Sequence, residues 1–131
     1  MFFANKYINL VNAIKIGFSH KLPMVRVPYN KKLINLLNVF IKVNYIKAYI
    51  VHNNLIFVKL YTGLENDINK KKIKHVSKPS IKYTISYKDL AIFTKYDFTV
   101  TVILHTSSGI MVHQEAIKKK VGGQVLFILF N

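Results

Sequence analysis

Two adjacent serines, Ser107 and Ser108, are the residues whose chemistry would matter most if this 131-residue chain were an enzyme. A serine nucleophile needs a histidine base, a carboxylate that orients the base, and a G-x-S-x-G turn between a strand and a helix. His105 and His113 are close in sequence, but Gly109 follows the serines and no glycine precedes them. The pattern therefore argues against catalysis, and a small serine hydrolase using Ser107 or Ser108 stays an alternative.

The same segment has the residue types that bind a nucleic-acid backbone at close range. Thr106, Ser107 and Ser108 carry small hydroxyls, and Gly109 lets the main chain approach a partner. Hydroxyls and backbone N–H groups form hydrogen bonds with phosphate, with the ribose 2′-OH and with base edges. A plain turn between two strands is the structural alternative for these four residues.

A lysine run and a glycine pair follow. Lys118, Lys119 and Lys120 would normally form a solvated face, but in so basic a chain we expect them to contact phosphates. No Gly-Lys-Ser/Thr pattern accompanies Gly122 and Gly123, and a strand is expected after them. The pair therefore predicts the end of a helix and close backbone packing, not a phosphate-binding loop.

The net charge of the chain indicates the kind of partner. It contains 20 Lys and Arg residues against 5 Asp and Glu, which gives a formal charge of +15. Such a charge is best explained by a polyanion, either nucleic acid or an anionic membrane surface. The longest apolar run, residues 125–130, is far shorter than the roughly 20 residues of a membrane-spanning helix. We therefore expect no membrane insertion, and binding to an anionic membrane surface stays an alternative.

Cofactors, metals and small-molecule substrates are not expected. The chain has no cysteine, and its five histidines show no H-x-x-x-H spacing. With 51% hydrophobic residues, however, it can bury a core.

Periodicity in the first half predicts the order α-β-α-β-β, with both helices covering one face of a sheet. Strands are expected at residues 24–27, 45–51 and 55–61, with a hairpin turn at 52–54. Asn30 is expected to cap the second helix, and Gly17 and Asn44 to end the two helices. The apolar helix stripes are Phe3, Tyr7, Leu10, Val11 and Ile14, and then Leu33, Leu36, Leu37, Phe40 and Ile41.

The second half is predicted to be mostly β with one short helix. Strands are expected at residues 73–76, 80–87, 98–104 and 124–130, and the helix at residues 113–120. The polar segment 62–72 is the best linker candidate. The prediction is thus an α+β fold of two small domains, residues 1–66 and 67–131.

Long stretches of the chain resemble the S8 family of small-subunit ribosomal proteins. The strongest match is "HTSSGIMVHQEAIKKKVGGQVL", which is similar to the C-terminal signature of that family, with Ser108 where the family has a lysine. A second match is "IKHVSKPSIKYTIS", and a third is the Asn12-Ala13 pair in the first predicted helix. The positions that fit the main signature are Thr106, Ser107, Gly109, Ile110, Met111, Glu115, Ala116, Val121, Gly122, Gly123, Gln124, Val125 and Leu126.

The resemblance implies a two-domain protein that is not an enzyme and that binds the central domain of small-subunit rRNA early in assembly. It implies neighbouring small-subunit proteins as further partners. The rRNA contacts that it suggests are Thr106, Ser107, Ser108 and Gly109, with weaker candidates at Ser77, Lys78 and Asn12. The abundance of Lys, Asn, Ile, Phe and Tyr is typical of AT-rich genomes. We therefore expect an organelle-encoded protein of a mitochondrial ribosome, with a plastid second and an AT-rich bacterium third.

Overall fold

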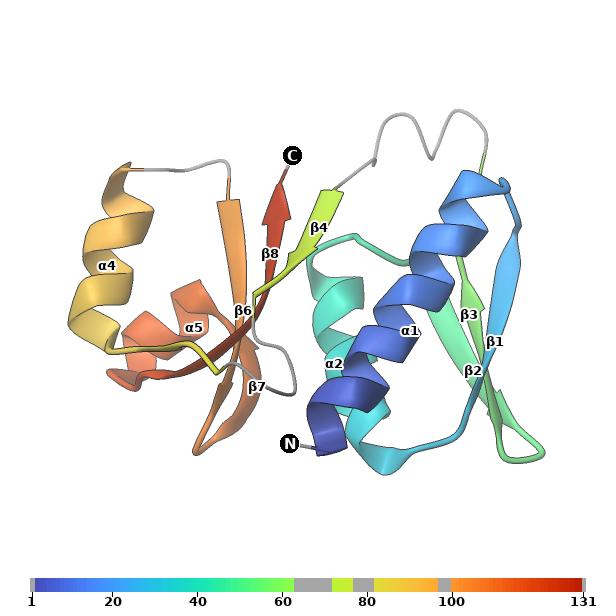
Figure 1. Cartoon of the computed structure of the whole chain (residues 1–131), viewed down its shortest axis with the longest axis horizontal. Coiled ribbons are helices and arrows are strands. Elements are labelled where there is room, and N and C mark those ends of the chain that lie inside the picture. The colour runs from blue at the N-terminus through green and yellow to red at the C-terminus, as the bar shows by residue number, and fades with distance from the viewer. Residues whose placement is uncertain (1, 63–71, 77–81, 97–99, 131) are drawn as a thin grey trace. The chain divides into compact units, whose positions relative to one another are not determined.

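The computed structural model of the chain describes residues 2–62, 72–76, 82–96 and 100–130. Its helices and antiparallel strands form two compact units, one of residues 5–70 and one mainly of residues 71–131 (Figure 1). The predicted α+β class is confirmed. The predicted domain boundary between residues 66 and 67 lies outside the described residues, as does nearly all of the expected linker, so the division into these two domains stays a prediction.

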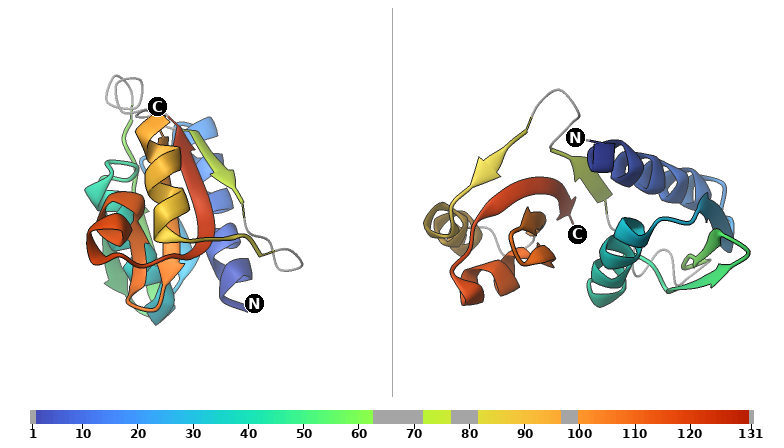
Figure 2. Two further views of the ribbon diagram at one scale, coloured as in Figure 1. Left: turned by 90° about the vertical axis from the view of Figure 1, so that its left-hand side faces the viewer. Right: turned by 90° about the horizontal axis from the view of Figure 1, so that it is seen from below.

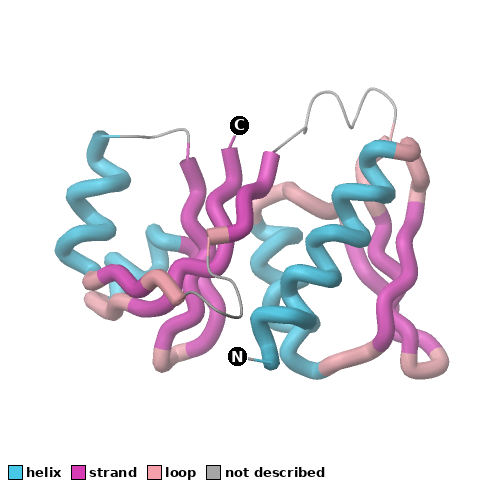
Figure 3. Tube along the Cα trace, in the orientation of Figure 1, coloured by secondary structure: helices cyan, strands magenta, loops and turns pink. Residues whose placement is uncertain are grey.

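In the first unit, two helices lie on one face of an antiparallel sheet with the strand order β1-β3-β2 (Figure 3). This arrangement confirms the predicted order of its elements. Those elements are α1 (Phe2–Ser19), β1 (Met24–Pro28), α2 (Lys31–Lys42), β2 (Ala48–His52) and β3 (Leu55–Lys59).

Most members of the two predicted helix stripes form the core of the first unit, although Ile41 is only partly buried. Tyr7, Leu10, Val11 and Ile14 are buried on α1, and Leu33, Leu36, Leu37 and Phe40 are buried on α2. The structure does not describe the side chain of Phe3. Tyr45 packs edge-on against Phe18 and Phe40, with ring centroids 5.5 and 5.0 Å apart. Its burial raises the pKa of the Tyr45 phenol, because the charged form would lose its hydration.

Asparagines shape three turns of the first unit. The Asn30 side chain accepts a hydrogen bond from the Lys32 N–H at 2.9 Å, so the predicted helix cap is confirmed. Asn53 and Asn54 both have positive φ, as a two-residue hairpin turn requires. Asn44 also adopts positive φ after α2, as predicted.

The expectation that Gly17 ends the first helix is wrong. The helix continues to Ser19, and Lys21 takes the left-handed conformation with φ 56°. A Cβ added to Gly17 would lie only 2.6 Å from side-chain atoms of Leu60 and Val25. Gly17 therefore lets the helix approach β1 and the end of β3 closely.

The second unit is an antiparallel sheet with two helices. The strand order is β4-β8-β6-β7, and β5 pairs with β8 beyond the end of β4. The register of β6 and β8 breaks between Ile103 and Leu104, and β8 curves along its length (Figure 2). The elements are β4 (Lys72–His75), β5 (Thr84–Ile85), α4 (Tyr87–Tyr96), β6 (Val100–Thr106), β7 (Gly109–Val112), α5 (His113–Lys119) and β8 (Gly123–Phe130).

Helix α4 was not predicted, so the expectation of a single short helix in this half is wrong. The strand expected at residues 80–87 is present only at Thr84–Ile85 within the described residues. The chain then turns into a helix because the Ser86 Oγ accepts the Asp89 N–H at 3.3 Å. Leu90 anchors α4 in a core cluster that contains Val102, Leu104, Met111 and Ala116. Ser86 followed by Asp89 three residues later is a typical start of a helix. The alternation of apolar residues just before it favoured a strand instead.

Candidate nucleic-acid interface

Strands β6 and β7 present Ser107 and Ser108 as an exposed two-residue turn. Thr106 pairs with Gly109 across the hairpin, and its side chain stabilises the turn through two hydrogen bonds. Its Oγ1 donates a hydrogen bond to the Gly109 carbonyl at 2.9 Å and accepts the Ser108 N–H at 3.1 Å. Thr106 is only 4% exposed, so its hydroxyl is used within the turn, whereas Ser107 and Ser108 are exposed.

Gly109 is needed for the backbone conformation of this turn. Its φ is +107°, a region that L side chains rarely adopt. A Cβ added there would meet nothing within 4 Å among the described residues. The space beside the Cα of Gly109 is therefore open among the described residues, and the contact of its main chain with a partner stays a prediction.

The Gly-Gly pair packs tightly behind this turn. A Cβ on Gly123 would overlap the carbonyl oxygen of His105 and lie 3.0 Å from Thr106 Cγ2, and one on Gly122 would overlap the carbonyl oxygen of Ile85. The predicted close packing is therefore confirmed. The prediction that the pair ends the helix is wrong, because Lys120 takes the left-handed conformation (φ 55°) that ends α5.

The three lysines lie at the C-terminal end of α5. Lys118 and Lys119 belong to its last turn, Lys120 is the C-cap, and all three are exposed. Cations at this end are favoured by the helix dipole, so the run has a structural reason as well as a proposed functional one.

His113 is built into the core of the hairpin and does not face the serine turn. It is 7% exposed, and its Nδ1 accepts the Val102 N–H at 3.1 Å. Burial lowers the pKa of His113, and the hydrogen bond needs an unprotonated Nδ1. His113 stands four residues beyond Gly109, roughly 13 Å along a strand. The arrangement therefore offers Ser107 no base from His113.

We predict that protonation of His113 destabilises the fold. The unfolded chain takes up the proton near the ordinary pKa of 6.5, whereas the folded chain resists it. The free energy of unfolding should therefore fall as pH drops below 6.5, by up to about 1.4 kcal/mol per pH unit from this group. Urea denaturation between pH 5 and 8 would measure the slope, with His113→Asn as the non-titrating control. Equal slopes for parent and variant would contradict the prediction.

The remaining predicted contacts are only partly described. Asn12 is exposed on α1, which belongs to the first unit, and Ser77 and Lys78 lie outside the described residues. The second unit brings the serine turn and the lysine run onto one hairpin-helix segment. The internal role of Thr106 was missed, because a sequence motif does not separate a hydroxyl that faces a partner from one that holds a turn.

The described parts of the chain offer neither a metal site nor a membrane-spanning helix. They contain no group of three or more His, Asp or Glu side chains arranged to hold a metal ion. No described helix is long and apolar enough to cross a membrane.

Comparison with known proteins gives consistent matches over nearly the whole chain. The model of the family described as Ribosomal protein S8 matches residues 5–130. The small ribosomal subunit protein uS8m of Acanthamoeba castellanii is 28% identical over 118 residues, which cover 90% of this chain and 93% of that protein. Protein uS8 of Rickettsia massiliae (strain Mtu5) is 33% identical over 126 residues, 93% of this chain and 94% of its own. Protein uS8c of Anthoceros angustus is 27% identical, with 90% and 92% covered.

Proposed function

Because the chain belongs to the ribosomal protein S8 family, whose members are structural proteins of the small ribosomal subunit, we propose that it binds the central domain of small-subunit rRNA. It supports assembly of the subunit and thereby translation, and it contacts neighbouring small-subunit proteins. It is a structural component and carries out no catalysis.

The observation that carries this proposal is the exposed turn at Ser107 and Ser108 on the hairpin of β6 and β7. Its hydroxyls can form hydrogen bonds with the minor-groove face of an irregular RNA helix, where 2′-OH groups and base edges are accessible. Thr106 and Gly109 fix the turn beforehand, so little conformational freedom is lost on binding. The turn therefore supplies selectivity for one rRNA site.

The charge supplies most of the affinity. A formal charge of +15 on a folded chain attracts any RNA, and each neutralised phosphate releases counterions into solution. The exposed lysines 118–120 belong to this electrostatic part of the interface, with Asn12, Ser77 and Lys78 as further contacts. Selectivity and affinity thus come from different residues, which makes them separable by mutation.

A mitochondrial ribosome is the proposed location, with a plastid ribosome as the alternative. The relatives named above carry mitochondrial, plastid and bacterial forms of the family name, and the residue usage is typical of an AT-rich genome. Sedimentation of organelle lysate on a sucrose gradient, with an antibody against this chain, tests both function and location. Co-migration with the small subunit, lost after RNase treatment, is expected. A free protein at the top of the gradient would overturn the proposal.

We predict that Ser107→Ala weakens binding to the specific rRNA site by roughly 1 kcal/mol or more, because an RNA atom loses its hydrogen-bond partner. Binding of the full chain to a central-domain rRNA fragment would measure the change by filter retention or calorimetry. A non-cognate duplex of equal length is the matched control, and its affinity should stay the same. An unchanged affinity for the specific fragment would rule out the role assigned to Ser107.

A further inference from the structure

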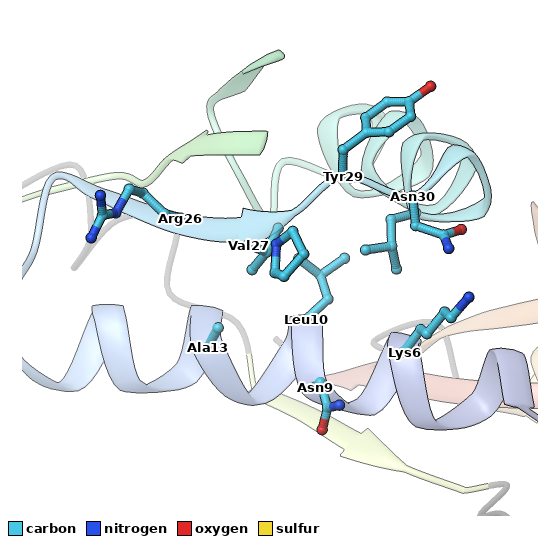
Figure 4. A pocket seen from close by; sticks show the side chains of 10 residues that line it. Lys6, Asn9, Leu10, Ala13, Arg26, Val27, Tyr29 and Asn30 are labelled. Atoms are coloured by element: carbon cyan, nitrogen blue, oxygen red, sulfur yellow. The ribbon is translucent and has the colours of Figure 1, made fainter. Parts of the chain in front are cut away.

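The sheet of the first unit has one face that neither α1 nor α2 covers (Figure 3). Successive residues of a strand point to opposite faces of a sheet, so each strand contributes alternate residues to each face. Val27, Ile56 and Val58 lie on the helix side and are at most 6% exposed. Figure 4 shows Val27 beside Leu10 of α1, in the space between β1 and the helix. A pocket of about 410 Å³ lies on this covered side, between α1, β1 and the start of α2.

The opposite face, which we call the outer face, follows from the register of the strands. Arg26, Phe57 and Ile50 lie side by side on β1, β3 and β2, with one row of residues on each side of them. Ile50 is 50% exposed and Met24 is 39% exposed, so the surface is accessible. The outer face consists of Met24, Arg26, Pro28, Ala48, Ile50, His52, Leu55, Phe57 and Lys59.

The outer face is more apolar than is usual for a sheet face in water. Antiparallel sheets with one solvated face place mainly polar residues on that face. Here Phe57 at the centre has Leu55 on the same strand and Ile50 beside it on β2. Met24 and Ala48 extend this apolar surface in the next row. An exposed apolar surface with polar residues at its border is typical of a site that binds another protein.

The border of the outer face carries cations and no acid. Lys59 lies at one end of the central strand, and His52 lies at the opposite end of β2. Arg26, on the edge strand β1, also lines the pocket, so it borders both faces. None of the residues in the three strands is acidic. The outer face therefore complements a negatively charged partner, and a second copy of the chain is disfavoured because the cations of both copies would meet.

The dimensions of the outer face suit a single helix. Three strands about 4.8 Å apart span roughly 10 Å, and strands of five residues are about 17 Å long. An α-helix with its side chains is about 10–12 Å wide, and about 11 residues cover the same length at 1.5 Å per residue. A helix of about three turns would therefore bury the outer face, as helices bury the apolar faces of sheets in layered folds.

We propose that the outer face binds an amphipathic helix, with acidic residues at its border, from a neighbouring protein of the small subunit. The apolar residues of that helix, spaced i, i+3, i+4 and i+7, contact Phe57 and Ile50, and its acids pair with Lys59 and Arg26. The inference rests on the proposed function, which includes neighbouring proteins as partners. It adds the surface that one of them contacts and the chemistry of the contacting segment.

RNA and an anionic membrane would also be attracted by the cations. Bases stack on exposed aromatic rings, whereas the large exposed side chains of this face are the aliphatic Ile50 and Met24, and Phe57 is partly buried. A membrane is disfavoured because the chain belongs to a family of ribosomal proteins. A protein helix therefore fits the outer face best.

The first test uses small ribosomal subunits that contain the full chain, treated with a water-soluble carbodiimide, which joins a lysine amine to a carboxylate in direct contact with it. Mass spectrometry should show Lys59 joined to an Asp or Glu of a neighbouring protein, within a segment whose apolar residues have helical spacing. If Lys59 stays unlinked while other exposed lysines are linked, the proposal is overturned. A link to a segment without that spacing, or to a second copy of the chain, would also overturn it.

The second test measures the affinity of the full chain for a labelled synthetic peptide of the linked segment. Ile50→Asp should weaken binding at least about tenfold, because an apolar contact is lost and an acid is placed beside the acids of the helix. Lys59→Gln should weaken it by about two- to fivefold, as expected for one exposed ion pair. Ile92→Asp is the matched control, because Ile92 is 58% exposed and belongs to the other unit, and it should bind like the parent. Circular dichroism of each variant checks the fold.

Binding to rRNA separates this proposal from the proposed function. Ile50→Asp and Ile92→Asp change the net charge equally, so both should bind a central-domain rRNA fragment with the same affinity. If Ile50→Asp binds the peptide like the parent while Ser107→Ala loses rRNA affinity, the outer-face proposal fails and the proposed function stands. If Ile50→Asp alone loses affinity for rRNA, or for liposomes of anionic lipid, the outer face binds RNA or membrane and the helix proposal is overturned. A chain absent from small subunits would overturn both.

Discussion

Gly123→Ala is expected to lower the free energy of unfolding of the chain by about 3 kcal/mol, the upper part of the range for overpacked sites. An added Cβ would overlap the carbonyl oxygen of His105, which is backbone and not a flexible side-chain end. The only relief is to separate β8 from β6, and these strands pair along most of their length. Separation would weaken the hydrogen bonds that join Thr106 and His105 to β8, directly behind the serine turn.

The matched control is Gly109→Ala in the same hairpin. Its Cβ would meet nothing within 4 Å among the described residues, so the effect comes from φ +107° alone. A penalty of about 1–2 kcal/mol is expected for a left-handed alanine. Urea denaturation of parent and both variants, followed by far-UV circular dichroism, measures the differences. If Gly123→Ala matched the parent, the β6–β8 contact would be adaptable and could not hold the turn rigid.

The two variants should also differ in RNA binding. Gly109 lies at the open surface of the turn, where a new methyl group would face the partner. Gly123 lies behind the turn, so its substitution reaches the RNA only through the position of Thr106. The loss of RNA affinity of each variant is compared with its loss of stability. A loss of affinity greater than the loss of stability indicates direct contact with RNA, and a matching loss indicates an effect on the position of the turn.

Elements with strong periodicity or clear capping residues were predictable from the sequence. The stripe through Leu10, Val11 and Ile14 and the cap at Asn30 appear in the structure as expected. Helix α4 was not predicted because Ile81, Tyr83 and Ile85 alternate like a strand, while Ser86 and Asp89 start a helix immediately afterwards. The local hydrogen bond at Ser86 and burial of Leu90 outweigh the alternation.

The turn of the candidate site was predictable from the sequence, and the role of each of its residues was less so. Ser107, Ser108 and Gly109 were expected to form a turn and do so, but the strand β7 that completes the hairpin was not predicted. The sequence could not indicate that Thr106 is buried, since this depends on packing between β6, β7 and Met111. Nor could it indicate the pocket beside Arg26, because α1 and β1 meet only in the folded unit.

Removing the three positive charges at the end of α5 is expected to lower the salt dependence of rRNA binding. Each lost phosphate contact should reduce the slope of log K against log salt by up to about 0.9, so three contacts give a reduction approaching 2.7. Lys118→Gln and Lys119→Gln keep the length of the side chains. Lys120→Asn suits the left-handed conformation that this residue adopts. Affinity for specific and non-specific RNA should fall by similar factors, because phosphate contacts carry no sequence information.

A control with the same change in net charge separates local contact from overall charge. Lys59, Lys72 and Lys74 are exposed on β3 and β4, away from α5 in the sequence, and their replacement by Gln removes three charges as well. Binding of the full chain to a central-domain rRNA fragment would be titrated from 50 to 300 mM potassium chloride. A larger loss of slope for the α5 variant assigns the lysine run to the interface. Equal slopes for that variant and the parent would remove it from the interface, and equal losses in both variants would show that net charge alone attracts the RNA. If the α5 variant has a lower salt slope but still prefers the specific RNA to the same degree, the affinity comes from the lysines and the selectivity from the turn at Ser107.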